Sequence, residues 1–203
     1  MPPIAQSQVV FQSGGKPIRL DAYLPETLDA PVPAVIALHG AGGNVSGMES
    51  YASVLAAEGF VVYLLHYFDR TGTEPADLQS MKQNFPLWMK TLWDAISFVE
   101  TQPQVDRERI ALLGFSLGAY LSLANSAIDP RVKAVVEFFG GMPKEMNLYE
   151  MPLPRANPAR RGRSYRPRRG SLPSTEVAGK EGNPVRNQNL SWCRPRIRVR
   201  NLA

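Results

Sequence analysis

The chain has 203 residues, of which 44% are hydrophobic and 20% are charged, a composition that suits one globular domain with a sizeable core. No apolar run approaches the ~18 residues of a membrane-spanning helix, and the first residues lack the basic and apolar regions of a signal peptide. Cys193 is the only cysteine, which excludes an internal disulfide bond. We therefore expect a soluble, cytoplasmic protein without a membrane partner.

The net charge of +5 averages two unlike segments of the chain. Residues 1–151 carry 10 Lys or Arg and 16 Asp or Glu, a net charge of −6. Residues 152–203 carry 12 Arg, one Lys and two Glu, a net charge of +11, and show neither helical nor strand periodicity. We expect a folded domain over 1–151 and a disordered, Arg-rich tail over 152–203.

A β-hairpin and a buried strand are the first predicted elements. Residues 9–11 and 18–24 flank a turn at 13–16 that contains two glycines, and the second of these runs alternates apolar and polar residues. The continuous apolar run at 33–38 is typical of a strand covered on both faces. It ends in a glycine-rich loop at 39–44.

Helices and strands alternate after this loop. Ser46 is the predicted N-cap of a helix near 48–58, which Gly59 ends. The elements expected next are a strand at 60–65, a helix at 85–102, a strand at 110–113, a helix at 117–127 and a strand at 132–139. This alternation predicts a three-layer α/β fold with a mostly parallel sheet, in which the regular pattern stops after the last of these strands.

Ser116 lies between a buried strand and a helix, in the sequence Gly114-Phe115-Ser116-Leu117-Gly118. A Gly-x-Ser-x-Gly match alone is weak, but this strand–turn–helix context is the one that a nucleophile elbow requires. The turn strains the serine backbone, and the flanking glycines relieve crowding around it. We predict that Ser116 is a catalytic nucleophile; the alternative is a structural glycine-rich turn.

A serine nucleophile needs two N–H donors aimed at the developing oxyanion. The residue after the nucleophile, here Leu117, supplies one, and a glycine-rich loop after an earlier strand supplies the other. Residues 39–43 form such a loop, and Ala41 is our candidate for the second donor. The alternative is a plain connection between strand and helix.

Four segments at the ends of predicted strands carry a family resemblance: residues 39–43 (HGAGG), 67–72 (YFDRTG), 114–120 (GFSLGAY) and 135–143 (VVEFFGGMP). As a set, within residues 8–152, they resemble the dienelactone hydrolase family of the α/β-hydrolase superfamily. The best-known members carry cysteine in the elbow, so Ser116 places the chain among the serine-bearing relatives. The resemblance implies hydrolysis of small esters or lactones without a cofactor or metal.

The resemblance also implies two candidate substrate-binding residues. Family members bind substrate carboxylate with an arginine near the end of the strand that here precedes His66, which makes Arg70 a candidate anion contact. His66 itself lies at the carboxyl edge of the predicted sheet, where ligands bind in such folds. The alternatives are a solvated loop arginine and a histidine that only packs or lines the pocket.

The base and acid that Ser116 needs are missing from their expected places. They follow the nucleophile along this fold in the order acid, then histidine, whereas both histidines, His39 and His66, precede Ser116. Asp129 and Glu137 follow it, but one lies in a connection and the other inside a strand. The family would place a His-Gly-x-x-Asp segment and later a Gly-His-Gly-Phe segment after residue 152, and neither is present.

A shifted reading frame explains this loss. Codons for residues 157–168, read one base later, permit a segment containing His-Gly-Glu-Ala-Asp, and those for residues 190–198 permit one ending in Gly-His-Gly-Phe. Both follow the family order. We hypothesise that residues 152–203 are a frameshift product, and sequencing of the coding DNA tests this.

Three functions are compatible with the sequence. The first is a serine hydrolase of small esters or lactones, impaired here because the triad is incomplete. The second is a nucleic-acid-binding protein that uses the basic tail, which we do not expect because the arginines would be an accident of codon overlap. The third is a non-catalytic remnant whose last strand is left as an uncovered edge.

Overall fold

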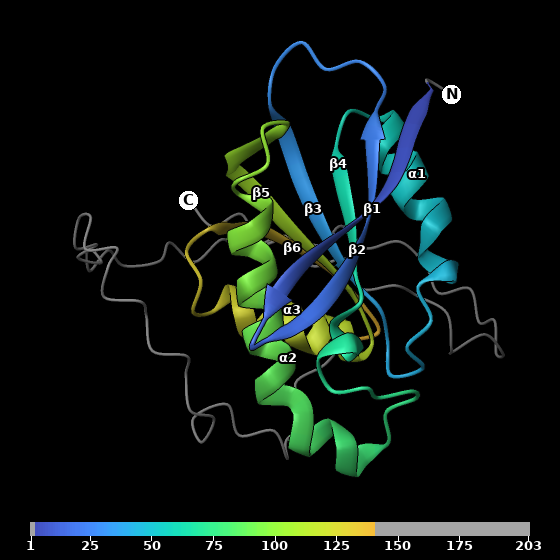
Figure 1. The fold of residues 1–203 in the computed structure, drawn as a ribbon, viewed down its shortest axis with the longest axis vertical. Helices are drawn as coiled ribbons and strands as arrows, with labels where there is room; N and C mark the ends of the chain where they lie inside the picture. The colour runs from blue at the N-terminus through green and yellow to red at the C-terminus, as the bar shows by residue number, and fades with distance from the viewer. Residues whose placement is uncertain (1–2, 141–203) are drawn as a thin grey trace, which may run out of the picture. The chain divides into compact units, whose positions relative to one another are not determined.

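The computed structural model describes residues 3–140. The tail at 152–203, with its expected disorder and frameshift, lies outside the described residues, as does the end of the domain predicted over 1–151. The elements in chain order are β1 (Ile4–Ser13), β2 (Lys16–Pro25), β3 (Val32–Leu38), the 3₁₀ helix η1 (Ser46–Met48), α1 (Glu49–Ala57), β4 (Val61–Leu65), the 3₁₀ helix η2 (Tyr67–Arg70), α2 (Leu78–Val99), β5 (Val105–Phe115), α3 (Leu117–Ser126) and β6 (Val132–Phe138) (Figure 1).

The six strands form one sheet in the order β1-β2-β4-β3-β5-β6 (Figure 1). β1 pairs with β2, and β2 with β4, in antiparallel fashion. The pairs β4–β3, β3–β5 and β5–β6 are parallel. The predicted α/β fold with a mostly parallel sheet is therefore confirmed. Because parallel strands end at the same edge, the loops after β3, β4, β5 and β6 meet there.

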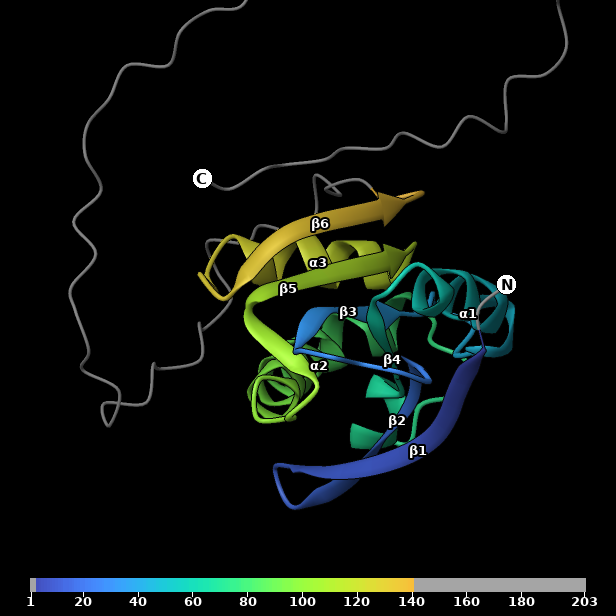
Figure 2. The ribbon, with the colours of Figure 1, turned by 90° about the horizontal axis from the view of Figure 1, so that it is seen from above.

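Helices cover both faces of this sheet (Figure 2). On one face, Trp88 and Leu92 of α2 and Leu121 of α3 join the larger apolar core and are fully buried. On the other face, Ala52 and Ala56 of α1 pack in a smaller core with residues of β3 and β4. The central strands β3 and β4 are therefore covered on both faces, with nearly all their residues buried. Among residues 3–140, no helix combines the length and apolar character needed to cross a bilayer.

The predicted hairpin is confirmed, although its strands are longer than expected. β1 and β2 pair over ten residues each, from Ile4 opposite Pro25 to Ser13 opposite Lys16. Gly14 and Gly15 form the turn with φ of 52° and 76°, a backbone conformation that glycine adopts without steric cost. Only the turn and the alternating strand were strong sequence signals, because most of β1 is exposed and polar.

The predicted N-cap of the helix near 48–58 is wrong. Ser46 is the first residue of η1, and α1 begins at Glu49 without a side-chain cap. The Ser46 backbone N–H instead donates to Asn44 Oδ1 at 2.9 Å, and its hydroxyl bonds the same oxygen. The Asn44 side chain thus accepts both the N–H and the hydroxyl of Ser46, and Ser46 does not cap α1. Asparagine side chains often bond nearby backbone donors in this way.

The second helix begins earlier than the apolar spacing predicted. α2 starts at Leu78, where the Asp77 carboxylate accepts a hydrogen bond from the Ser80 N–H at 2.7 Å and the Ser80 hydroxyl accepts one from the Asp77 N–H at 2.8 Å. This reciprocal pair is a capping box that uses Ser at the third position in place of Glu or Gln. The first turns of α2 are largely exposed, so hydrophobic periodicity could not reveal them.

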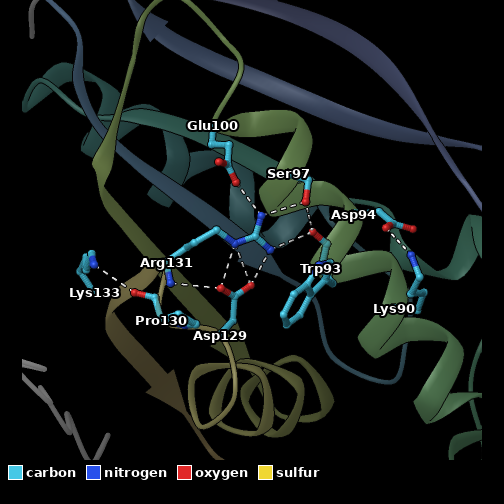
Figure 3. A network of polar contacts seen from close by, with 9 residues as sticks. All are labelled: Lys90, Trp93, Asp94, Ser97, Glu100, Asp129, Pro130, Arg131 and Lys133. Carbon is cyan, nitrogen blue, oxygen red and sulfur yellow. Dashed lines mark hydrogen bonds and ion pairs between the residues drawn. The ribbon is translucent and has the colours of Figure 1, made fainter. Parts of the chain in front are cut away.

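Arg131 ties the start of β6 to the end of α2 (Figure 3). Its guanidinium makes ion pairs with Asp129 at 2.6 Å and Glu100 at 2.5 Å, donates to the Ser97 hydroxyl at 2.8 Å and lies over the Trp93 ring. The Asp129 side chain is fully buried. A buried carboxylate needs such a partner, because its desolvation is otherwise uncompensated.

Candidate active site

Ser116 occupies a strained turn between β5 and α3. Its backbone has φ of 48° and ψ of −111°, outside the regions that non-glycine residues normally adopt. The Ser116 N–H donates to the carbonyl oxygen of Phe138 at 2.9 Å, which fixes the turn to the end of β6. Its side chain is exposed and makes no hydrogen bond to any other described residue. Strain of this kind persists only where surrounding contacts enforce it.

The flanking glycines are required by close backbone contacts. A Cβ on Gly114 would lie 2.6 Å from the Ala119 Cα, and one on Gly118 would lie 2.7 Å from the His39 carbonyl oxygen. Both distances are shorter than real Cβ contacts. The crowding inferred from the sequence of the nucleophile elbow, residues 114–118, is therefore present on both sides of Ser116.

The loop after β3 lies against the nucleophile elbow. A Cβ on Gly40 would be 3.4 Å from the Ser116 Cβ and 4.0 Å from its Oγ. The Ala41 carbonyl accepts a hydrogen bond from the Ala76 N–H at 2.8 Å, which holds the following peptide in place. Within the described part of the chain, neither the Ala41 N–H nor the Leu117 N–H donates a hydrogen bond. Both N–H groups therefore have no acceptor among residues 3–140.

The His39 side chain packs against this loop and bonds to it. The ring is buried, stacks on Tyr67 with a centroid distance of 4.1 Å and donates from Nδ1 to the Gly40 carbonyl oxygen at 2.8 Å. The Tyr67 hydroxyl donates to the His39 carbonyl oxygen at 2.8 Å. Burial lowers the pKa of His39 to about 4, so the ring is neutral at pH 7. His39 is therefore placed to shape the loop.

His66 lies at the end of β4 and turns toward β2. Its Nε2 pairs with Asp21 Oδ2 at 2.6 Å, and the backbone N–H of His66 donates to the Arg19 carbonyl oxygen at 3.1 Å. β3 separates β4 from β5, so the strands that carry His66 and Ser116 are about 10 Å apart. The ring is thus paired with β2, the antiparallel neighbour of β4, on the side away from β5. Its predicted role in substrate binding stays a prediction.

Arg70 reaches the turn of the β1–β2 hairpin. Its Nη1 donates to the carbonyl oxygens of Ser13 at 2.8 Å and Gly14 at 2.6 Å. Its Nε is buried and has no hydrogen-bond partner in the part of the chain that the structure describes. A contact between Arg70 and a substrate carboxylate would therefore have to use Nη2. That contact also stays a prediction.

Glu137, which the sequence analysis set aside as a candidate acid because it lies inside a strand, pairs in the sheet with Gly114 of the elbow. The residue is 7% exposed, and its Oε2 has no hydrogen-bond partner among residues 3–140. The only signal was a charged residue inside a strand otherwise rich in valine and phenylalanine. Asp129, the other acid considered, is committed to Arg131.

Residues 3–140 contain no group of three His, Cys, Asp or Glu side chains arranged to hold a metal ion. Around Ser116 the described residues place its own hydroxyl, the N–H groups of Leu117 and Ala41, which have no acceptor there, and the buried side chain of Glu137. This set matches the needs of acyl transfer, in which an alkoxide attacks a carbonyl and the resulting oxyanion is bound by N–H donors.

The dienelactone hydrolase family profile matches residues 20–154, which include the elbow and the loop after β3. The chain belongs to this family. Among curated relatives, acyl-coenzyme A thioesterase 1 of Mus musculus is 30% identical over 125 residues, 62% of this chain and 27% of the relative. The quorum-quenching protein AidA of Acinetobacter baumannii (strain MDR-ZJ06) is 26% identical over 137 residues, 66% of this chain and 44% of the relative.

A solved structure extends the agreement to the fold. The crystal structure of a dienelactone hydrolase-like promiscuous phosphotriesterase from metagenomic libraries superposes with a TM-score of 0.62 at 22% identity. The match covers 71% of this chain and 62% of that one. This chain therefore has the α/β-hydrolase fold of the dienelactone hydrolase family, and it spans less than two thirds of the length of these proteins.

Proposed function

We propose that this member of the dienelactone hydrolase family is a serine hydrolase of small esters or lactones, with Ser116 as the nucleophile. The observation that carries the proposal is the strained Ser116 backbone next to two N–H groups, of Ala41 and Leu117, that have no acceptor among residues 3–140. Such strain at a polar, exposed residue is typical of a site held ready for reaction.

The reaction follows from these groups. Ser116 Oγ attacks the carbonyl carbon and forms an acyl bond, while its proton passes to a base. The N–H groups of Leu117 and Ala41 bind the oxyanion of the tetrahedral intermediate, and the first turn of α3 adds the positive end of its dipole. Collapse of the intermediate releases the alcohol with the proton from the base, and water then repeats the sequence to free the acid.

The described residues place no general base next to Ser116. Among the described residues the only histidines are His39, buried beneath the loop, and His66, paired with Asp21 on the far side of β3. We infer that turnover is impaired, because triad members act as a unit and oxyanion binding alone leaves only a small residual rate.

Covalent labelling with a fluorophosphonate probe tests the nucleophile separately from turnover. We expect slow labelling that Ser116→Ala removes and that Ser53→Ala, a change at an exposed serine of α1, leaves intact. The second measurement is hydrolysis of 4-nitrophenyl acetate by the chain and by a frame-repaired protein, in which one base is removed near codon 152. Repair should raise the rate, and activity that survives Ser116→Ala in either protein would overturn the proposal.

A further inference from the structure

Residues 71–77 form a strap that connects η2 to α2 and contacts the loop after β3. The contact is a hydrogen bond in which the Ala76 N–H donates to the Ala41 carbonyl oxygen at 2.8 Å. Residues 74–75, in the middle of the strap, are exposed. Because burial does not hold this part of the chain, the position of the Ala76 N–H depends on the polar contacts of the strap.

Three polar contacts attach the strap to α2. Trp88 Nε1 donates to the Thr71 hydroxyl at 3.0 Å, and the Trp88 ring is itself fully buried in the larger apolar core. Asn84 Nδ2 donates to the Thr73 hydroxyl at 3.3 Å, and the hydroxyls of Thr71 and Thr73 bond each other at 2.8 Å. The capping box at Asp77 makes the third attachment. The strap is therefore fixed to α2 near both of its ends.

The strap acts on the peptide groups on either side of the Ala41 Cα. The peptide before it joins Gly40 to Ala41 and carries the Ala41 N–H, the candidate oxyanion donor. The Gly40 carbonyl oxygen accepts from His39 Nδ1 at 2.8 Å and from the Gly43 N–H at 3.1 Å. In a trans peptide the N–H points away from the carbonyl oxygen, so these bonds direct the Ala41 N–H to the opposite side. The bond from Ala76 fixes the peptide that follows.

We propose that the strap positions the Ala41 oxyanion donor of the Ser116 site, with the Thr71 hydroxyl and the Ala76 N–H as positioning groups. This inference rests on the proposed function and adds what fixes one of its two donors. Oxyanion donors are effective because they are held in place before charge develops, so no reorganisation is needed during the reaction. A strap released from α2 would remove one of the two restraints on Ala41.

The rate of fluorophosphonate labelling tests this inference. In the labelling reaction Ser116 Oγ bonds to phosphorus, fluoride leaves and the serine proton passes to water, while the phosphoryl oxygen occupies the oxyanion position. Thr71→Val removes the hydroxyl that joins the strap to Trp88, so the rate constant at saturating probe should fall about tenfold, less than the hundredfold or more expected for loss of a whole donor. The probe concentration for half-maximal rate should change little.

Two variants serve as controls for Thr71→Val. Thr71→Ser retains the hydroxyl and should restore most of the labelling rate. Thr101→Val removes a hydroxyl that also bonds a backbone carbonyl, that of Phe98, but lies just beyond the other end of α2. Its labelling rate should equal that of the unaltered chain.

Ala76→Pro removes the N–H that bonds the Ala41 carbonyl and leaves every other side chain of the strap in place. The labelling rate constant should again fall about tenfold. Leu78→Pro is the matched control, because Leu78 is an exposed residue at the first position of α2, where proline is tolerated. Leu78→Pro should label at the rate of the unaltered chain. If Ala76→Pro fails to fold, the comparison of Thr71→Val with Thr71→Ser decides alone.

A second probe separates positioning from a purely structural role. Sulfur accepts hydrogen bonds more weakly than oxygen, so the ratio of labelling rates for the fluorophosphonate and its fluorothiophosphonate analogue reports the contacts made to the atom in the oxyanion position. This ratio should fall about threefold in Thr71→Val and Ala76→Pro, the effect of weakening one hydrogen bond. Thr71→Ser should retain the ratio of the unaltered chain.

Three results overturn the inference. Unchanged labelling in both Thr71→Val and Ala76→Pro would show that the strap does not position the donor. An equal fall for the two probes would assign the strap a structural role only. In both cases labelling that Ser116→Ala removes leaves the proposed function standing. Labelling that persists in Ser116→Ala would instead reject the nucleophile, and this inference with it.

Discussion

Gly118 lies against the carbonyl oxygen of His39, so closely that a Cβ would come within 2.7 Å of that oxygen. This contact joins the first turn of α3 to the loop that follows β3. Leu117 lies in that turn, and Ala41 lies in that loop. The geometry of the candidate oxyanion site therefore depends on a residue that offers no side chain.

Gly118→Ala should lower the free energy of unfolding by about 3 kcal/mol, because the new methyl meets backbone atoms that cannot move aside as a flexible side chain would. Gly47→Ala is the matched control, since a Cβ at Gly47 meets nothing within 4 Å. Urea denaturation of the two variants checks the difference. Equal midpoints would show that the contact is relieved at little cost.

Ser116→Gly should stabilise the protein by about 1 kcal/mol while removing fluorophosphonate labelling, because glycine adopts a positive φ without steric strain. Ser116→Ala should remove labelling without this gain, since alanine keeps the Cβ that makes φ of 48° unfavourable. Thermal denaturation of both variants separates strain from loss of the hydroxyl. Identical melting temperatures would contradict a strained backbone at Ser116.

Stability should fall as the pH drops from about 6.5 to about 4, because of His39. Burial holds the pKa of His39 at about 4 in the folded protein, against 6.5 for an exposed histidine. The unfolded chain therefore binds more protons in this window, and full protonation costs about 3 kcal/mol of stability. His39→Gln should show a flatter pH dependence of the unfolding free energy than the unaltered chain. Parallel curves would mean that His39 is protonated without penalty.

Arg131→Met should destabilise the protein by about 4 kcal/mol, because it leaves the buried carboxylate of Asp129 without its charged partner. The double variant with Asp129→Asn should lose less than the two single variants together. A double-mutant cycle by urea denaturation measures this coupling. Strict additivity would indicate that the ion pair contributes no coupling energy.

Arg70→Gln should lower the unfolding free energy by about 1–2 kcal/mol, because the hairpin turn loses charged hydrogen bonds to the carbonyls of Ser13 and Gly14. In the frame-repaired protein, the ratio of KM values for a carboxylate-bearing ester and its neutral analogue should stay unchanged. A selective rise of KM for the anionic ester would instead assign Arg70 to substrate binding.

The order of elements and the elbow could be predicted because their signals are local. The apolar runs of β3, β4 and β5 and the glycines around Ser116 are contiguous in sequence, and each determines its own backbone conformation. One local signal gave a wrong prediction. Ser46 suits a helix N-cap, but its backbone N–H donates to the side chain of Asn44, two residues before it. The start of α2 was missed because its first turns are largely exposed and its capping box uses an uncommon residue pair.

The destinations of Arg70, His66 and Glu137 could not be predicted, because each depends on pairing between distant segments. Arg70 meets the hairpin turn, His66 meets Asp21 across the β2–β4 pair, and Glu137 reaches the elbow through the register of β5 with β6. The sequence by itself identified the family, predicted Ser116 as the nucleophile and contains no histidine after it. Only the tertiary structure decided which charged groups of residues 3–140 are paired and which, such as Glu137, keep a buried atom without a partner there. The reason is that sheet pairing brings together residues that no local pattern relates.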